Sequence, residues 1–101
     1  MEILDWELER QEISLYVGNK IMYIPLTPLE YRTFRLYRDG VIHEDSTAIK
    51  RIYGNKKSNM NNFKEIIARL NKKIKPIGKI YRYYTVGYKF IPIEREKWEK
   101  K

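Results

Sequence analysis

Residues 59–75, with the sequence NMNNFKEIIARLNKKIK, decide the fold of this chain of 101 residues. Apolar side chains recur there at helical spacing and form one stripe: Phe63, Ile66, Ile67, Leu70 and Ile74. At about 100° per residue, the opposite side carries amide, small and charged side chains: Asn61, Glu65, Ala68 and Lys72. Lys64 and Lys75 flank one edge of that side, and Arg69 flanks the other. An amphipathic helix with a merely solvated outer side has the same pattern. However, a helix that packs on a core with one side and exposes amides and cations on the other is typical of proteins that insert a helix into a DNA groove.

Composition favours one compact domain. A chain of this length forms a single domain, and its 43% hydrophobic and 14% aromatic residues supply a small core. The absence of cysteine excludes disulfides, thiol chemistry and thiolate metal sites. No apolar run approaches the roughly 20 residues of a membrane span, and the acidic N-terminus does not resemble a signal peptide. We therefore expect a cytoplasmic protein that does not bind membranes.

The net charge of +8 is distributed unevenly. Residues 1–45 carry five Lys/Arg against nine Asp/Glu, a net charge of −4, whereas residues 46–101 carry sixteen against four, a net charge of +12. A domain with one basic side attracts a polyanion to that side. We expect nucleic acid, because its affinity for proteins depends largely on Lys and Arg at phosphates. A generally basic surface would explain the total charge but not the asymmetry.

An N-terminal antiparallel sheet of about three strands is predicted from alternating apolar and polar residues. The alternation covers residues 4–9, 13–17 and 21–24. Gly18 and Asn19 offer a two-residue hairpin turn between the last two stretches. The sheet is acidic and contains no cluster that could do chemistry, so we interpret it as a scaffold.

Two shorter helices are predicted before residue 59. Thr27 is a strong N-cap, Pro28 occupies the first helical position and Glu30 completes a capping box. A second helix spans about residues 45–53 and stops at Gly54. These elements give the long helix two partners to pack against.

The sequence after the long helix predicts a wing. Residues 79–91, KIYRYYTVGYKFI, are basic and rich in β-formers, with a break near Thr85 that divides them into two strands. A basic hairpin directly after such a helix is typical of the wing of a winged helix-turn-helix. We therefore predict an α+β winged helix-turn-helix domain over residues 1–92, followed by a charged C-terminal tail, 93–101. Within it, the antiparallel sheet occupies residues 1–25, the three-helix core 26–75 and the β-hairpin wing 79–91.

No constellation of catalytic or metal-ligating residues is found in the sequence. His43, the only histidine, lacks partners at metal-ligand spacing, and no Gly-rich phosphate loop is present. Ser14, Ser46 and Ser58 have no nucleophile-elbow context. We predict no enzymatic activity, no metal and no cofactor.

Four motifs and the order of the elements resemble the C-terminal effector domain of OmpR/PhoB-type response regulators of two-component systems. LTPLEYRTF at 26–34 resembles the start of that family's first helix, and IYG at 52–54 resembles the end of its second. IARLNKKI at 67–74 resembles part of its third helix, and TVGYKF at 85–90 resembles the end of its wing. The motifs occur in the family's order and at its spacing.

The resemblance implies that the third helix enters the major groove of duplex DNA, with the wing on the adjacent backbone or minor groove. It implies sequence-specific binding, often by two copies as a homodimer on tandem repeats. The loop before the third helix corresponds to a segment that some members present to RNA polymerase: Asn55, Lys56, Lys57 and Ser58. No receiver domain precedes the effector-like region, which leaves a stand-alone regulator or a fragment.

Three positions depart from the family pattern. The arginine that usually follows the helix leucine is Asn71 here. The arginine and first glycine of the family's wing fall at Tyr84 and Thr85. Because threonine reaches positive φ less easily than glycine, we expect a wider wing turn.

Our leading hypothesis is a sequence-specific, duplex-DNA-binding transcription regulator. Asn61 and Asn62 are suited to adenine, Glu65 to cytosine N4, and Ala68 to a thymine methyl group. Arg69 is suited to guanine or to a phosphate.

The lysines and the wing are assigned mainly to phosphates. Lys72 and Lys73 equally suit the negative end of the helix dipole, and both roles are compatible. The predicted contacts are, on the helix, Asn61, Asn62, Lys64, Glu65, Ala68, Arg69, Lys72 and Lys73, and, on the wing, Lys79, Arg82, Tyr84 and Thr85.

Other interpretations remain open. Tyr81, Tyr83, Tyr84 and Tyr88 suit stacking on single-stranded bases, but alternating tyrosines in a hairpin more often pack on the core, the interpretation we favour. A second class of function is a winged helix used for protein contact, such as an RNA polymerase adaptor; a third is shape-selective RNA binding. Salt-dependent binding to duplex DNA with a strong preference for one sequence would separate the first hypothesis from the others.

Overall fold

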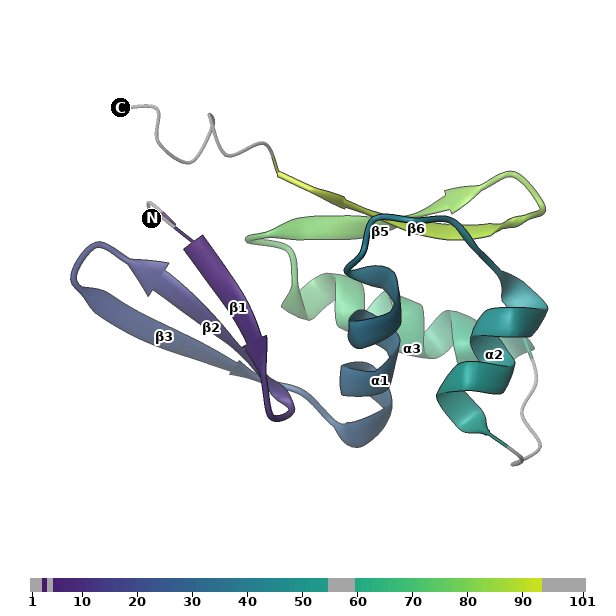
Figure 1. The fold of residues 1–101 in the computed structure, drawn as a ribbon, viewed down its shortest axis with the longest axis horizontal. Helices are drawn as coiled ribbons and strands as arrows, with labels where there is room; N and C mark the ends of the chain where they lie inside the picture. The colour runs from purple at the N-terminus through teal and green to yellow at the C-terminus, as the bar shows by residue number, and fades with distance from the viewer. Residues whose placement is uncertain (1–2, 4, 55–59, 94–101) are drawn as a thin grey trace.

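The computed structural model describes residues 3, 5–54 and 60–93 and has an α+β architecture. Figure 1 shows the β1–β3 sheet beside the three helices and the β5–β6 hairpin lying across them. In chain order, the elements are β1 (Asp5–Glu9), β2 (Glu12–Val17), β3 (Lys20–Pro25), α1 (Pro28–Tyr37), β4 (His43–Glu44), α2 (Asp45–Tyr53), α3 (Met60–Lys73), β5 (Gly78–Tyr83) and β6 (Gly87–Pro92).

The N-terminal sheet is antiparallel, in the order β1-β2-β3, which confirms the prediction of three strands. Gly18, with φ of 62°, lies first in the two-residue turn between β2 and β3. Positive φ at that position is what glycine supplies at low cost in such hairpins. The turn between β1 and β2 uses Arg10 and Gln11 at φ of 30° and 64°, which the sequence did not indicate.

The first helix begins with the predicted capping box. The Thr27 hydroxyl accepts a hydrogen bond from Glu30 N at 3.2 Å, and Glu30 Oε1 accepts one from Thr27 N at 2.8 Å. Pro28 is the first residue of α1. These bonds satisfy donors that every helix start leaves without an intrahelical partner, and such a cap contributes about 1 kcal/mol.

The short strand β4 was not predicted. Its two residues pair with β6, with His43 opposite Tyr88 and Glu44 opposite Gly87, so the C-terminal sheet has the order β4-β6-β5. The approach is so close that a Cβ on Gly87 would lie 1.8 Å from the carbonyl oxygen of His43. A side chain at position 87 would therefore separate β4 from the wing.

The core lies between α3, α1 and the inner faces of both sheets. Phe63 and Leu70 on α3 are fully buried, as the helical stripe predicted. Three rings join the sheets to α1: Phe34 lies 5.5 Å from Trp6 and 5.2 Å from Phe90, measured between ring centroids. Aromatic pairs at this separation add about 0.5–1.5 kcal/mol to their burial. These rings join α1 to both sheets, and the buried side of α3 packs against the same core.

Among the described residues, no helix is long and apolar enough to cross a membrane. Within the same residues, no group of three or more His, Asp or Glu is placed to hold a metal ion.

Candidate nucleic-acid interface

One side of α3 is presented to solvent. The predicted orientation of the helix is confirmed, because the apolar stripe is buried and the opposite side is exposed. The exposed residues of this face are Asn61, Asn62, Lys64, Glu65, Ala68, Arg69 and Lys72. A 14-residue helix anchored by its buried side can enter a major groove without rearranging the domain.

The side chain of Asn71 fastens α3 to the wing. Its Nδ2 donates to the carbonyl oxygen of Ile80 at 3.0 Å, and its Oδ1 accepts from Ile80 N at 2.8 Å. β5 is the edge strand of the C-terminal sheet, so the amide pairs with the backbone of Ile80 as another strand would. The sequence identified Asn71 only as a departure from the family pattern, and its partner could not be foreseen from local spacing.

Lys73 lies beside the exposed face, with its side chain 35% exposed and its ammonium group paired with a buried carboxylate. Its Nζ lies 2.6 Å from Glu30 Oε1 and donates to the carbonyl oxygen of Pro25 at 3.1 Å. Glu30 is only 2% exposed. Burial raises the pKa of Glu30, but the hydrogen bonds from Lys73 and Thr27 outweigh it, and the pKa lies below its ordinary value. The phosphate contact predicted for Lys73 competes with this ion pair, because its ammonium neutralises a buried carboxylate.

Arg82 holds the wing in place and is not a free cation. Its Nη1 lies 2.9 Å and 2.8 Å from the two carboxylate oxygens of Asp45. Its Nε donates to the carbonyl oxygen of Tyr84 at 3.0 Å, and its guanidinium carbon lies 4.9 Å from the centroid of the Tyr88 ring. Asp45 is the first residue of α2, so Arg82 connects α2 to the wing turn. The phosphate contact predicted for Arg82 competes with this ion pair.

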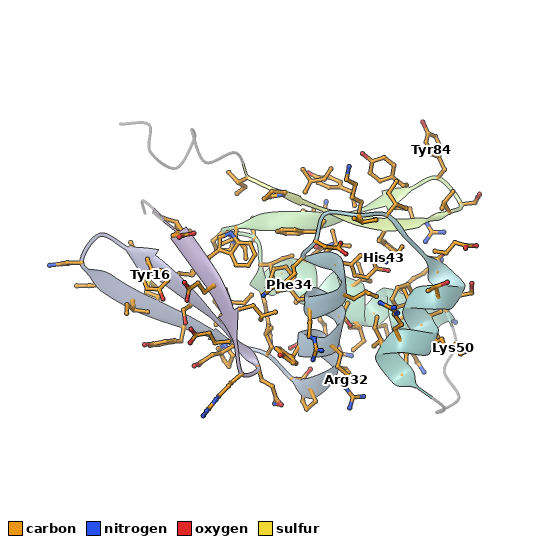
Figure 2. All side chains as sticks on the ribbon, viewed as in Figure 1. Tyr16, Arg32, Phe34, His43, Lys50 and Tyr84 are labelled. Carbon is orange, nitrogen blue, oxygen red and sulfur yellow. The ribbon has the colours of Figure 1, made fainter. Side chains whose placement is uncertain are left out.

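The wing turn does not place Thr85 at positive φ. The strands pair as far as Tyr83 and Gly87, which leaves three residues in the turn. Positive φ falls on Tyr84, at 51°, and not on Thr85. Tyr84 is 87% exposed, and Figure 2 shows its ring at the tip of the hairpin, pointing away from the rest of the molecule. A non-glycine residue in the left-handed region is strained, and such residues cluster at functional sites.

The tyrosines of the hairpin divide between two environments. Tyr88 is buried, with 8% exposed, whereas Tyr81 is 44% exposed. The interpretation that the tyrosines pack on the core is therefore correct for Tyr88 and wrong for Tyr81 and Tyr84. The strand register explains the difference between Tyr88 and Tyr81. Tyr88 pairs with Arg82, and Tyr81 pairs with Lys89 in the adjacent pair. Side chains of adjacent pairs point to opposite faces of a hairpin, so the two rings do as well.

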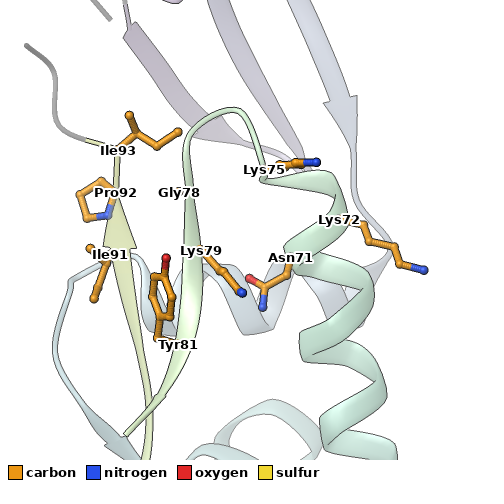
Figure 3. Close-up of a pocket in the computed structure, with 9 residues that line it drawn as sticks. All are labelled: Asn71, Lys72, Lys75, Gly78, Lys79, Tyr81, Ile91, Pro92 and Ile93. Carbon is orange, nitrogen blue, oxygen red and sulfur yellow. The ribbon is translucent and has the colours of Figure 1, made fainter. Parts of the chain in front are cut away.

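A basic hollow lies where the C-terminal end of α3 meets the base of the hairpin. Its volume is about 560 Å³, and its lining includes Lys72, Lys75 and Lys79 together with Tyr81 and Ile91. Figure 3 shows the Lys79 side chain in the space between β5 and α3, with Lys72 extending away from the hairpin. Within the described part of the chain, none of the three ammonium groups forms an ion pair. The fold thus brings the predicted phosphate contacts Lys72 and Lys79 together and adds Lys75.

The predicted polymerase-contact loop, Asn55, Lys56, Lys57 and Ser58, lies outside the described residues, as does the tail from residue 94. Of the predicted contacts, those that lie on described residues and outside the two ion pairs are the exposed face of α3, Lys79 and the wing turn.

No protein-family model matches the chain, and no curated protein has a matching sequence. Its fold, however, is similar to the folds of solved domains, among them the following three. The DNA-binding domain of the response regulator AdeR, crystallised in complex with an intercistronic region, has a TM-score of 0.71 and 16% identity, over 84% of this chain and 92% of that one.

The DNA-binding domain of Bacillus subtilis CssR has a TM-score of 0.68 and 17% identity, over 86% of this chain and all of that one. The C-terminal domain of the nisin resistance regulator NsrR, a lantibiotic response regulator, has a TM-score of 0.64 and 24% identity, over 83% of this chain and 89% of that one. The predicted fold class is thereby confirmed: the chain has the winged-helix fold of these domains.

Proposed function

We propose that the protein is a transcription regulator that binds duplex DNA in a sequence-specific manner. α3 would lie in the major groove, and the wing would follow the adjacent backbone or minor groove. The observation that carries the proposal is the exposed face of α3, which presents amides, a guanidinium and lysines from a helix fixed by the core and by Asn71. The fold shared with a domain crystallised on DNA supports the same function.

The proposed roles follow side-chain chemistry. Asn61 and Asn62 pair with adenine, Glu65 accepts from cytosine N4, and Ala68 contacts a thymine methyl group, because these contacts match the pattern of each base in the major groove. Arg69 reads guanine or holds a phosphate. The phosphate contacts are Lys64, Lys72 and Lys79, with Tyr84 and Thr85 at the tip of the wing.

A salt titration on two duplexes tests the proposal. A site is first selected from random duplexes, and affinity is then measured for that site and for a scrambled duplex. Arg69→Ala should weaken binding to the selected site and leave the unfolding midpoint nearly unchanged. The matched control is Arg35→Ala, which removes the same charge from the solvent side of α1 and should leave site preference intact.

Glu65→Ala separates base reading from charge. Removal of a carboxylate near phosphates should raise affinity for the scrambled duplex. At the base position that Glu65 contacts, the difference in binding free energy between the preferred base and the others should fall by about 1–3 kcal/mol. If wild-type protein binds the selected and scrambled duplexes equally at every salt concentration, sequence-specific binding is refuted. A winged helix that acts through protein contact, for example as an RNA polymerase adaptor, would then be the better account.

The proposal extends to assembly and location. Two copies would bind tandem repeats, the segment 55–58 would contact RNA polymerase, and the protein would act in the cytoplasm without a metal or cofactor. Comparing complex size on duplexes with one and two selected sites tests the first point. A second copy that binds no more tightly beside an occupied site would argue against a dimer on DNA.

A further inference from the structure

The outer face of the β5–β6 hairpin carries side chains to which duplex binding assigns no role, Tyr81, Tyr83 and Lys89, beside the proposed phosphate contact Lys79. The strand register brings Lys79, Tyr81 and Tyr83 of β5 onto one face with Lys89 and Ile91 of β6. The neighbouring positions on the other face include Ile80, Tyr88 and Phe90, which are buried in the core. Tyr81 and Ile91 are 44% and 38% exposed. The outer face therefore combines rings and cations that no core requirement explains.

A lysine accompanies each ring of this face. Lys79 Nζ lies 5.1 Å from the centroid of Tyr81, and Lys89 Nζ lies 5.7 Å from the centroid of Tyr83. Within the described residues, neither ammonium forms an ion pair with a carboxylate. Each ammonium on its flexible stem can therefore move to a phosphate while the ring beneath receives a base.

This geometry favours a single strand over a duplex. Residues two apart in a strand are separated by about 7 Å, twice the 3.4 Å that separates successive bases along one strand of a duplex. Tyr81 and Tyr83 can thus each receive a base only if the bases are separated from one another. In a duplex both faces of each base are covered by its neighbours. Exposed aromatic rings combined with cations are the usual composition of surfaces that bind single-stranded nucleic acid.

We propose that the outer face of the hairpin is a second nucleic-acid site, which binds single-stranded DNA or RNA. Tyr81 and Tyr83 stack on two successive bases, and Lys79 and Lys89 neutralise the flanking phosphates. The hollow of about 560 Å³ beside Lys79 adjoins this face and adds the ammonium groups of Lys72 and Lys75 (Figure 3). A strand leaving Tyr81 would therefore continue over a basic surface.

The test compares one labelled strand with the selected duplex. Fluorescence anisotropy is measured with oligothymidylate and oligouridylate of about 12 nucleotides, within the range of known single-strand sites. Tyr81→Ser should lower affinity for the single strand about tenfold, the typical effect of removing one stacking ring, and Tyr81→Phe should restore it. Lys89→Ala should lower affinity for the single strand and reduce its salt dependence. None of the three changes should alter affinity for the selected duplex.

Arg69→Ala is the reciprocal control, because Arg69 lies on the exposed face of α3 and not on the hairpin. It should weaken duplex binding and leave single-strand binding unchanged. Equal losses of single-strand binding in Arg69→Ala and Tyr81→Ser would mean that general electrostatics is responsible, which overturns the proposal. So would the absence of binding to both oligonucleotides at low salt. Because each variant is measured on both ligands, this failure is distinguishable from a failure of duplex recognition.

Discussion

The hydrogen bonds of Asn71 allow a quantitative test of how the wing is attached to α3. Asn71→Ala removes both bonds to the backbone of Ile80. Each such bond contributes about 0.5–1.5 kcal/mol net, so the pair is worth about 1–3 kcal/mol. Asn71 is partly exposed and lines the hollow beside β5, so water can occupy the space that its side chain leaves, and we expect a loss of about 1–2 kcal/mol in the free energy of unfolding.

Urea denaturation measures this loss. With an m-value of about 1–2 kcal/mol per molar urea for a domain of this size, the midpoint should fall by about 1 M. The control is Lys72→Ala, one residue further along α3 and exposed, which should leave the midpoint unchanged. Asn71→Ala should also weaken duplex binding although Asn71 is not among the proposed base contacts, because it loosens the wing relative to α3. An unchanged midpoint would refute the view that this amide fastens the two elements.

Three further predictions follow from named contacts. Leu70→Ala should lower the free energy of unfolding by about 2–5 kcal/mol, because Leu70 is fully buried, whereas Arg69→Ala should leave the unfolding midpoint nearly unchanged. The reverse result would mean that α3 is rotated about its axis, with Arg69 and not Leu70 facing the core. Because the pKa of Glu30 is lowered in the folded protein, its contribution to stability is present above its ordinary pKa and is lost as the pH falls through the lowered pKa. In urea melts over a descending pH series, Lys73→Ala should therefore destabilise the protein fully at about pH 7 and progressively less as the pH falls below the ordinary pKa of Glu30. A loss that does not change with pH would contradict the ion pair. Lys79→Ala should weaken selected and scrambled duplexes alike and lower the slope of log K against log salt by about one unit; an unchanged slope would mean that Lys79 does not contact a phosphate.

The parts of the fold that could be predicted depend on neighbouring residues. The capping box joins Thr27 to Glu30, three positions apart, and the helix from residue 45 to 53 is closed by Gly54 at φ of 66°. The helical stripe likewise repeats every three or four residues. Such signals survive in a single sequence because the chemistry that creates them is local.

What could not be predicted depends on distant partners. Lys73 and Glu30 are 43 positions apart, and Arg82 and Asp45 are 37 apart. No periodicity indicates such pairs, so both cations were assigned to phosphates. β4 is only two residues long, too short to show alternation, and it exists because Gly87 lets another backbone approach. The exposure of Tyr81 was missed because an alternating pattern assigns side chains to two faces of the hairpin but does not show which face is exposed to solvent.

The two internal ion pairs determine which cations remain for a polyanion. Glu30 and Asp45, from the acidic first half of the sequence, neutralise Lys73 and Arg82 of the basic second half. Each pair also fastens an element that borders the proposed interface, since Lys73 joins α3 to the start of α1 and Arg82 joins the wing to α2. The remaining cations of α3 and the hairpin base are exposed on elements that these contacts join. A polyanion would then meet flexible cationic side chains on backbone elements that are already in place, and the ordering of these elements would not have to be supplied by binding.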